Sequence, residues 1–341
     1  MYVPQSILVT GAAGFIASNL CAALVKAFPD AAIVGVDKLD TCSSVHNLTD
    51  VLPHELFQFV KADFRNVDAM VELLQKNRVD TVLHLGANTH VDNSFGNSIE
   101  FTLNNTLGTH CLLEACRQVG GIHRFINCST DEVYGETVDG TATETRQLLP
   151  TNPYAAAKAG AEMIARSYQI SYGLPVITTR GNNVYGPRQY PEKLIPKFVL
   201  QCLTKRPMTI HGEGSTSRSY LHVDDVSAAF LAVLQRGVVG ETYNIGTDHE
   251  IRVDDVAAEL AKVFPDASVV HVRDRLFNDT RYDISDAKLR SMGWSPQITF
   301  EDGLRDTIEW YREADCFAHW NGVLDALEAH PLDKTLDYSM T

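Results

Sequence analysis

The stretch TGAAGFIASNL, residues 10–20, joins an apolar run to a segment with helical spacing, and it decides the fold class of this chain. Gly11, Gly14 and Ala17 follow the pattern GxxGxxA. Small residues at this spacing allow a tight strand-to-helix turn whose backbone can approach a pyrophosphate, which then sits at the helix N-terminus. Glycine at such a turn can also serve the backbone conformation alone. The motif therefore predicts a βαβ unit with a dinucleotide as its candidate ligand.

An acidic residue at the end of the next apolar run, Asp37, strengthens the dinucleotide interpretation. It follows Ala17 by about twenty residues, where a carboxylate can accept hydrogen bonds from a ribose diol and repel a 2′-phosphate. These residues favour NAD over NADP. Asp63 ends the third apolar run and is placed to reach an adenine, and a helix N-cap is an equal alternative for it.

Short apolar runs alternate along the chain with segments of helical spacing, which is typical of a parallel, doubly wound sheet. The runs are SILVT (6–10), AIVGVD (32–37), FQFVKAD (57–63), TVLHLGA (81–87), RFINCST (124–130) and PVITTR (175–180). Beyond them, loops rich in Gly and Pro alternate with shorter helices. A helix near 224–235 and the strand TYNIG (242–246) are expected to return to the sheet.

The predicted fold class is therefore α/β, a Rossmann-like doubly wound parallel sheet with a smaller α/β substrate-binding domain. The NAD-binding domain is expected to comprise residues 1–181 and 222–247, and the nucleotide-sugar-binding domain residues 182–221 and 248–320. Residues 321–341 are expected to form a C-terminal tail that begins with a helix.

Composition argues against several classes of partner. Acidic residues outnumber basic ones by 43 to 29 among 341 residues, and the formal net charge of −14 argues against non-specific binding to nucleic acid or an anionic membrane. The first residues, MYVPQSILVT, lack the pattern of a signal peptide, and no apolar run approaches the roughly 18 residues of a membrane span. The seven cysteines form no CxxC pair, as is typical of free thiols in a reducing compartment. We expect a cytoplasmic protein without a metal site.

The segment TNPYAAAKAGAEM (151–163) is expected to begin a helix, with Asn152 as N-cap and Pro153 at the first helical position. Tyr154 and Lys158 then lie one turn apart on one face. Such a pair is usually an exposed helical pair, but here the helix follows the fifth strand of a dinucleotide-type sheet. A nearby ammonium favours the phenolate, which makes Tyr154 a usable base toward a sugar hydroxyl.

The segment STDEVYG (129–135) places Asp131 and Glu132 directly after the fifth apolar run. Open α/β sheets bind ligands at this carboxyl edge, and the two side chains can converge if the chain leaves the pleat just after Ser129. An exposed acidic turn is the alternative. Because Thr130 and the tyrosine–lysine pair accompany them, we favour two catalytic carboxyls.

Four motifs occur in order along the chain: STDEVYG (129–135), TNPYAAAK (151–158), NVYGPRQYPEKLIPKF (183–198) and YNIG (243–246). In these motifs the chain resembles, from about Ser6 to Trp310, the extended short-chain dehydrogenase/reductase family. Within it, the nucleotide-diphosphate-glucose 4,6-dehydratases, in particular the dTDP-glucose type, are most similar. Related 4-epimerases carry small or uncharged residues where this chain has Asp131 and Glu132, and the decarboxylases that make UDP-xylose have Ser in place of the Asp.

The resemblance implies a lyase that converts dTDP-glucose to dTDP-4-keto-6-deoxy-glucose and water, with internal hydride transfer through bound NAD+, as in rhamnose and other deoxysugar biosynthesis. UDP-glucose is the alternative substrate, and a non-catalytic NAD- and nucleotide-sugar-binding scaffold is a remoter alternative. Tyr154 is implied to take the C4 hydroxyl proton, with Thr130 bonded to that oxygen and Lys158 holding the nicotinamide ribose. Glu132 is implied to take the C5 proton, and protonated Asp131 to donate to the departing C6 hydroxyl. Adjacent carboxyls in a closed site disfavour double ionisation, which suits this division.

The resemblance also implies the binding residues. The expected cofactor-binding residues are Gly11, Gly14, Phe15, Ile16, Asp37, Lys38, Asp63, Phe64, Leu85, Ala87, Asn104, Tyr154 and Lys158. The expected substrate-binding residues are Thr89, His90, Asn183, Lys193, Leu194, Arg218, Arg275 and Asn278.

Three positions depart from the family pattern. Ala17 stands in place of the usual third glycine, DRLFN (274–278) stands where many bacterial members have DRPGH, and Val253 stands where those members often have Asn.

Helices near 105–119 and 154–170 carry apolar residues beyond one core face, and the family pairs the equivalent helices, so a homodimer is expected.

Overall fold

The computed structural model describes residues 1–137, 140–273 and 282–328. Its larger part is a seven-stranded sheet in the order β10-β6-β5-β4-β1-β2-β3, with every neighbouring pair parallel. The strands are β1 (Ser6–Thr10), β2 (Ala32–Asp37), β3 (Phe57–Lys61), β4 (Thr81–His84), β5 (Arg124–Thr130), β6 (Val176–Gly181) and β10 (Thr242–Ile245). Each apolar run of the sequence forms a strand, and the predicted Rossmann-like α/β class is confirmed.

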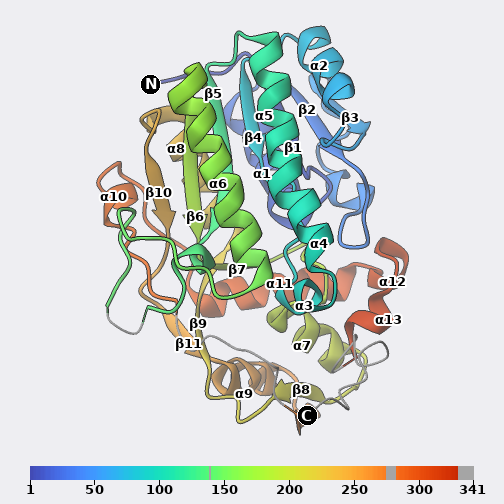
Figure 1. Cartoon of the computed structure of the whole chain (residues 1–341). Coiled ribbons are helices and arrows are strands. Elements are labelled where there is room, and N and C mark those ends of the chain that lie inside the picture. The colour runs from blue at the N-terminus through green and yellow to red at the C-terminus, as the bar shows by residue number, and fades with distance from the viewer. Residues whose placement is uncertain (138–139, 274–281, 329–341) are drawn as a thin grey trace.

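Helices cover both faces of this sheet (Figure 1). On one face α1 (Phe15–Ala27) packs against α8 (Val223–Arg236); on the other α5 (Gly108–Val119) lies between α2 (Val67–Lys76) and α6 (Pro153–Tyr172). Both faces of the strands are therefore buried, which is why β1 is buried along its whole length and is continuously apolar from Ile7 to Val9 rather than alternating.

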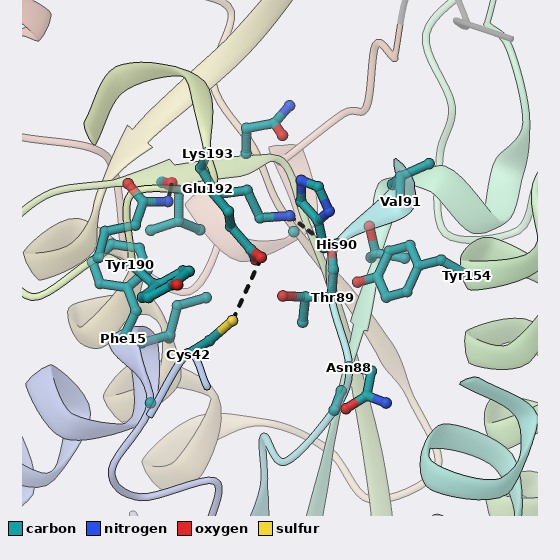
Figure 2. Close-up of a pocket in the computed structure, with 18 of the residues that line it drawn as sticks. Phe15, Cys42, Asn88, Thr89, His90, Val91, Tyr154, Tyr190, Glu192 and Lys193 are labelled. Carbon is teal, nitrogen blue, oxygen red and sulfur yellow. Dashed lines mark hydrogen bonds between the residues drawn. The ribbon is translucent and has the colours of Figure 1, made fainter. Parts of the chain in front are cut away.

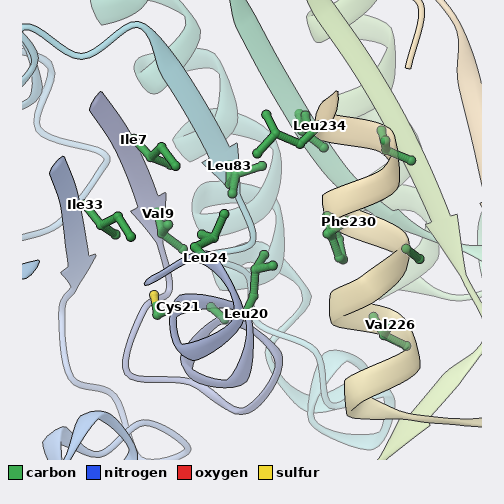
Figure 3. Packing of buried hydrophobic residues seen from close by; sticks show 14 of the residues in the cluster. Ile7, Val9, Leu20, Cys21, Leu24, Ile33, Leu83, Val226, Phe230 and Leu234 are labelled. Carbon is green, nitrogen blue, oxygen red and sulfur yellow. The ribbon is translucent and has the colours of Figure 1, made fainter. Parts of the chain in front are cut away.

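Alternate residues of β1 serve the two faces, as strand geometry requires. Ile7 and Val9 pack with Leu24 of α1 and Phe230 of α8, whereas Leu8 belongs to the core on the opposite face (Figure 3). Helix α8 and strand β10 thus return to the sheet as the sequence indicated.

A smaller part lies beyond the carboxyl ends of the strands (Figure 1). It contains the sheets β11-β9-β7 and β12-β8 and a second apolar core that includes Phe198, Leu260 and Leu304. Its strands are β7 (Asn183–Tyr185), β8 (Met208–His211), β9 (Ser217–His222), β11 (Glu250–Arg252) and β12 (Val269–Val272). Its helices are α7 (Leu194–Leu203), α9 (Val253–Val263), α11 (Phe300–Glu313), α12 (Cys316–His319) and α13 (Val323–Ala326), whereas α10 (Ala287–Arg290) packs against β10 of the main sheet. The domain bounds stay a prediction.

Short helices border the carboxyl edge of the main sheet. They are the 3-10 helices η1 (Val45–Leu48) and η3 (Asp131–Tyr134), the helices α3 (Val91–Gly96) and α4 (Ser98–Phe101), and the π-helix η2 (Thr102–Leu107) that runs into α5. All seven cysteines are free. Among the described helices, none is both long and apolar enough to cross a bilayer.

Candidate functional site

A cavity of about 870 Å³ lies where the carboxyl ends of the main strands meet the smaller part of the fold. Residues that follow β1, β2, β4, β5 and β6 line it on one side, and segment 189–196 lines it on the other. All five expected catalytic residues line this cavity, as does every expected cofactor-binding residue except Asp63.

The glycine turn after β1 forms one wall. Gly11 has φ +70°, and a Cβ there would lie 2.8 Å from the Cα of Gly86, so only glycine fits between these two chain segments. Helix α1 begins after Gly14 without a side-chain cap. Its first N–H groups therefore remain available at the cavity, which is the arrangement that binds a phosphate group.

Asp37, at the end of β2, is buried at the cavity wall. Its Oδ1 accepts hydrogen bonds from Leu39 N–H at 2.7 Å and the Ser43 hydroxyl at 3.0 Å, and its Oδ2 accepts from Ala13 N–H at 3.1 Å. Burial raises the pKa of Asp37, while these bonds oppose the shift. A carboxylate offers about four acceptor positions, so Oδ2 can still accept a hydroxyl such as that of a ribose.

Asp63 is not among the described residues that line the cavity. Its carboxylate accepts hydrogen bonds from the N–H and Nε–H of Arg65, each at 2.9 Å, and the charge of Arg65 helps to hold its pKa below the ordinary value. The alternative role of N-cap is wrong, because Asn66 caps α2 by accepting from Ala69 N–H. The adenine contact of Asp63 stays a prediction.

The carboxyls of Asp131 and Glu132 reach the cavity because β5 ends at Thr130 and the chain turns at once into η3. Asp131 Oδ2 accepts from Asn182 Nδ2 at 2.7 Å, and Oδ1 is 3.1 Å from the Thr130 hydroxyl. Glu132 Oε2 accepts from Asn152 Nδ2 at 2.8 Å. The two carboxyls therefore have separate amide partners.

Burial raises the pKa of Asp131 to about 7, and the neighbouring charge of Glu132 adds to the shift. Hydrogen bonds from Asn182 and Thr130 and the charge of Arg218 oppose it. A carboxyl with this pKa is largely protonated below pH 7, in line with the expected neutral acid beside an anion.

Tyr154 and Lys158 stand on the first turns of α6, whose N-cap is Asn152 with Pro at the first position, as predicted. Lys158 Nζ donates to Cys128 O at 2.6 Å. Burial, with the charge of Glu132 second, raises the pKa of Tyr154 well above its ordinary value, and burial lowers the pKa of Lys158. In this structure the pKa of Tyr154 is thus raised rather than lowered, and its role as a base assisted by Lys158 stays a prediction.

Segment 189–196 faces the glycine turn across the cavity. Lys193 Nζ donates to Thr89 O at 2.7 Å, and the Cys42 thiol donates to Glu192 Oε2 at 3.5 Å (Figure 2). The other expected substrate-binding residues His90, Asn183, Leu194 and Arg218 also line the cavity, as does Val253. Arg275 and Asn278, with the segment DRLFN, lie outside the described residues.

Sequence reasoning missed Asn182 and the second role of Asn152. Strand register contained a signal for the first: Thr130 is paired with Gly181, so the next residues, Asp131 and Asn182, leave the sheet side by side. No sequence signal marked the bond from Asn152 to Glu132, since an N-cap explains an asparagine at that position by itself.

Comparison with known proteins relates the chain to nucleotide-sugar dehydratases. The family model described as GDP-mannose 4,6 dehydratase matches residues 8–307. A trifunctional UDP-glucose 4,6-dehydratase/UDP-4-keto-6-deoxy-D-glucose 3,5-epimerase/UDP-4-keto-L-rhamnose-reductase of Arabidopsis thaliana is 54% identical over 336 residues, covering 97% of this chain and 50% of the relative. The chain thus spans about half the length of that relative.

Two further relatives match over nearly their whole length. A dTDP-D-glucose 4,6-dehydratase of Mus musculus is 43% identical over 336 residues, 96% of this chain and 94% of its own. The crystal structure of a dTDP-glucose 4,6-dehydratase from Streptomyces venezuelae with NAD and TYD bound has a TM-score of 0.88 at 37% identity, covering 94% of this chain and 100% of its own. The chain therefore belongs to the GDP-mannose 4,6 dehydratase family of NAD-dependent epimerases and dehydratases.

Proposed function

We propose that the chain is an NAD-dependent nucleotide-sugar 4,6-dehydratase, a hydro-lyase that converts dTDP-glucose to dTDP-4-keto-6-deoxy-glucose and water. One observation carries the proposal: Asp131 and Glu132 share a cavity with Tyr154 and Lys158, and each carboxyl has its own amide partner. A simple dehydrogenase needs the tyrosine and lysine alone, whereas elimination of water also needs an acid and a base at neighbouring carbons.

The residues present fit NAD. The turn at Gly11 and the uncapped start of α1 suit a pyrophosphate, and the remaining acceptor position on Asp37 suits the adenosine ribose. When bound, NAD+ supplies a reversible acceptor for the hydride that leaves glucose C4 and returns to C6. Lys158 is assigned to the nicotinamide ribose.

Tyr154 is assigned as the base that takes the C4 hydroxyl proton, with Thr130 holding that oxygen. Because the pKa of Tyr154 is raised by burial and by Glu132, the phenol is protonated at rest. To act as a base, the phenol must first lose this proton. A positive charge or a hydrogen-bond donor that enters the cavity favours this loss, because it lowers the pKa of Tyr154.

The 4-keto group acidifies C5–H, and Glu132 is assigned to remove this proton. Asp131, whose pKa is raised to about 7, is assigned to protonate the C6 hydroxyl as it departs. A scaffold protein without activity is disfavoured, because Thr130, Asp131, Glu132, Tyr154 and Lys158 are all retained around one cavity.

UDP-glucose is a second candidate substrate, favoured by a specific observation. The relatives whose names include UDP-glucose 4,6-dehydratase are 52–54% identical to this chain, against 41–43% for relatives named dTDP-D-glucose 4,6-dehydratase. The latter match over most of their own length, the former over half. Thymine and uracil differ by one methyl group, which a pocket distinguishes by only about 1–3 kcal/mol.

The test is turnover of both sugar nucleotides by the same preparation. We expect a 4-keto product without stoichiometric build-up of reduced cofactor, because each catalytic cycle returns the hydride. Accumulation of one NADH per product would replace the proposal with a simple dehydrogenase, and the ratio of kcat/KM for the two nucleotides assigns the substrate. Binding of both without turnover would favour a scaffold.

We also propose that the protein is a homodimer of the cytoplasm. Apolar side chains on the α4–η2 segment and on α6 are exposed on the outer side of the α5–α6 layer: Ile99, Leu103, Leu107, Met163 and Ile170. A second copy that pairs these helices would bury them, as the family resemblance implies.

A further inference from the structure

Asn182 lies in the short link between β6 and β7, beside the carboxyl of Asp131. The Asn182 residue is buried, and its backbone N–H donates to Ile245 O at 3.1 Å, at the end of the strand β10 that returns to the sheet. Asn182 also lines the cavity. The return of β10 therefore fixes the place of a polar side chain within the site.

The orientation of the Asn182 amide is fixed by a donor that has no alternative. Thr247 N–H donates to Asn182 Oδ1 at 3.2 Å, and a backbone N–H can only donate. The other end of the amide is therefore Nδ2, which donates to Asp131 Oδ2 at 2.7 Å. Gly246 permits this approach, because a Cβ there would lie 3.1 Å from Asn182 Oδ1 and 2.9 Å from Ile284 Cγ1.

This arrangement makes the two oxygens of Asp131 unequal. Oδ2 is held as an acceptor by an N–H, so a proton on Oδ2 would weaken a short hydrogen bond. Oδ1 lies 3.1 Å from the Thr130 hydroxyl, which can donate to a carboxylate or accept from a carboxyl O–H. A proton on Oδ1 would keep both hydrogen bonds, with the Thr130 hydroxyl as its acceptor.

Building on the proposed function, we propose that Asn182 is a positioning residue of the dehydration step, which holds Asp131 Oδ2 as an acceptor so that Oδ1 carries the proton for the C6 hydroxyl. In that step the C5–H electron pair forms the C5=C6 bond after Glu132 takes the proton. The C6–O bond breaks, and the proton on Oδ1 completes the departing water.

Other charged groups around Asp131 set the background for this effect. Glu132 on η3 raises the pKa of Asp131, and Arg218 on β9 lowers it. The charge of Asp131 in turn adds to the effect of burial, which raises the pKa of Tyr154 on α6. The bond from Asn182 favours the ionised form, so its loss shifts the titration of Asp131 upward.

The experiment compares Asn182→Leu, and Asn182→Ala as a less bulky second variant, with wild type across pH. Loss of a hydrogen bond to a charged group corresponds to about one pH unit, so the alkaline limb of kcat should move up by about that amount. We expect kcat to fall at least about tenfold, with KM within about twofold. Exchange of C5 hydrogen with solvent should persist, because Glu132 keeps its own amide partner.

Two controls separate positioning from a structural role. Asn244→Ala removes another buried asparagine, whose amide donates to Ala142 O and Ser285 O, and it should lower Tm without moving the alkaline limb. In an Asp131→Asn background, Asn182→Leu should cause no further loss of kcat if it acts through Asp131.

An unchanged alkaline limb and kcat in both Asn182 variants would overturn the inference while leaving the dehydratase intact. A further tenfold loss in the Asp131→Asn background would also overturn it. Failure of the wild-type protein to form any 4-keto product would count against the proposed function instead.

Discussion

Asn152 and Glu132 are joined by a hydrogen bond of 2.8 Å that links the start of helix α6 to η3, the short helix that follows strand β5. The same Asn152 side chain accepts from Ala155 N–H at 2.8 Å and so caps α6. One amide group thus positions both the carboxylate assigned as base and the helix that carries Tyr154 and Lys158. The cap of α6 and the orientation of Glu132 for the proposed reaction therefore depend on the same residue, Asn152.

Substitution of Asn152 is expected to separate these two roles. Asn152→Ala should lose about 1 kcal/mol of stability with the cap and also release Glu132, lowering C5–H exchange with solvent by about tenfold or more. Asn152→Asp should keep the cap but place a second carboxylate against Glu132, so exchange falls while Tm changes less. The measurements are thermal unfolding and deuterium incorporation at C5.

Asn66→Ala is the matched control for that pair. Asn66 caps α2 by the same kind of bond, to Ala69 N–H at 3.1 Å, and does not line the cavity. It should lose similar stability and keep full exchange. Equal loss of exchange in the Asn66 and Asn152 variants would show that helix stability alone controls the site.

Division of labour between the two carboxyls gives a second prediction. Glu132→Gln should still oxidise C4 but lose C5 exchange, whereas Asp131→Asn should retain exchange and slow the loss of the C6 hydroxyl. The reason is that each carboxyl has its own partner, Asn152 or Asn182, so removal of one leaves the other oriented. Single-turnover absorbance of the reduced cofactor and mass spectrometry at C5 measure the two steps. Wild-type exchange in Glu132→Gln would show that another group is the base.

Much of the fold followed from sequence because its signals are local. Strand β1 and the turn at Gly11 and Gly14 are specified within a few residues, and the cap at Asn152 with Pro153 fixed the start of α6. The same locality explains the limits. Asn182 meets Asp131 only through the register of β5 with β6.

Electrostatics were harder to predict than position. Tyr154 and Lys158 stand on the expected face of α6, yet the pKa of Tyr154 is raised because it is buried near Glu132. Burial at a site depends on every element that closes over it, including segment 189–196 from the smaller part. A rule based on helical spacing carries no information on that closure.

The exposed apolar face of α6 gives a third prediction. Met163→Glu together with Ile170→Glu should convert a homodimer to a monomer at micromolar concentration, because two charges would be buried at the helix pairing surface. Sedimentation velocity measures the change. Val238→Glu, at a residue that is 59% exposed after α8, is the control and should leave the mass unchanged. A wild-type monomer in the same run would refute the homodimer.

The raised pKa of Asp131 predicts a pH-dependent gain in stability when this carboxyl is replaced. Its pKa is about 7 in the folded protein against an ordinary value of 3.8, so the folded state binds the proton more tightly than the unfolded state. The wild-type protein therefore loses stability from this group as pH rises from about 4 to 7, and the loss levels off above 7. Asp131→Asn keeps the neutral shape and avoids it.

Asp131→Asn should accordingly be more stable than wild type without ligand, by an amount of up to about 4 kcal/mol at pH 8 and less than half of that at pH 5. The measurement is the difference in Tm between the two proteins at each pH, in which groups common to both cancel. Asp248→Asn, which removes a carboxyl charge at a side chain that is 94% exposed, is the control. Because the variant loses the acid assigned to the C6 hydroxyl, the gain in stability should accompany a loss of dehydration. An Asp131→Asn protein whose advantage is constant from pH 5 to 8 would show that the carboxyl is ionised throughout this range, and the assignment of Asp131 as a neutral acid would then fail.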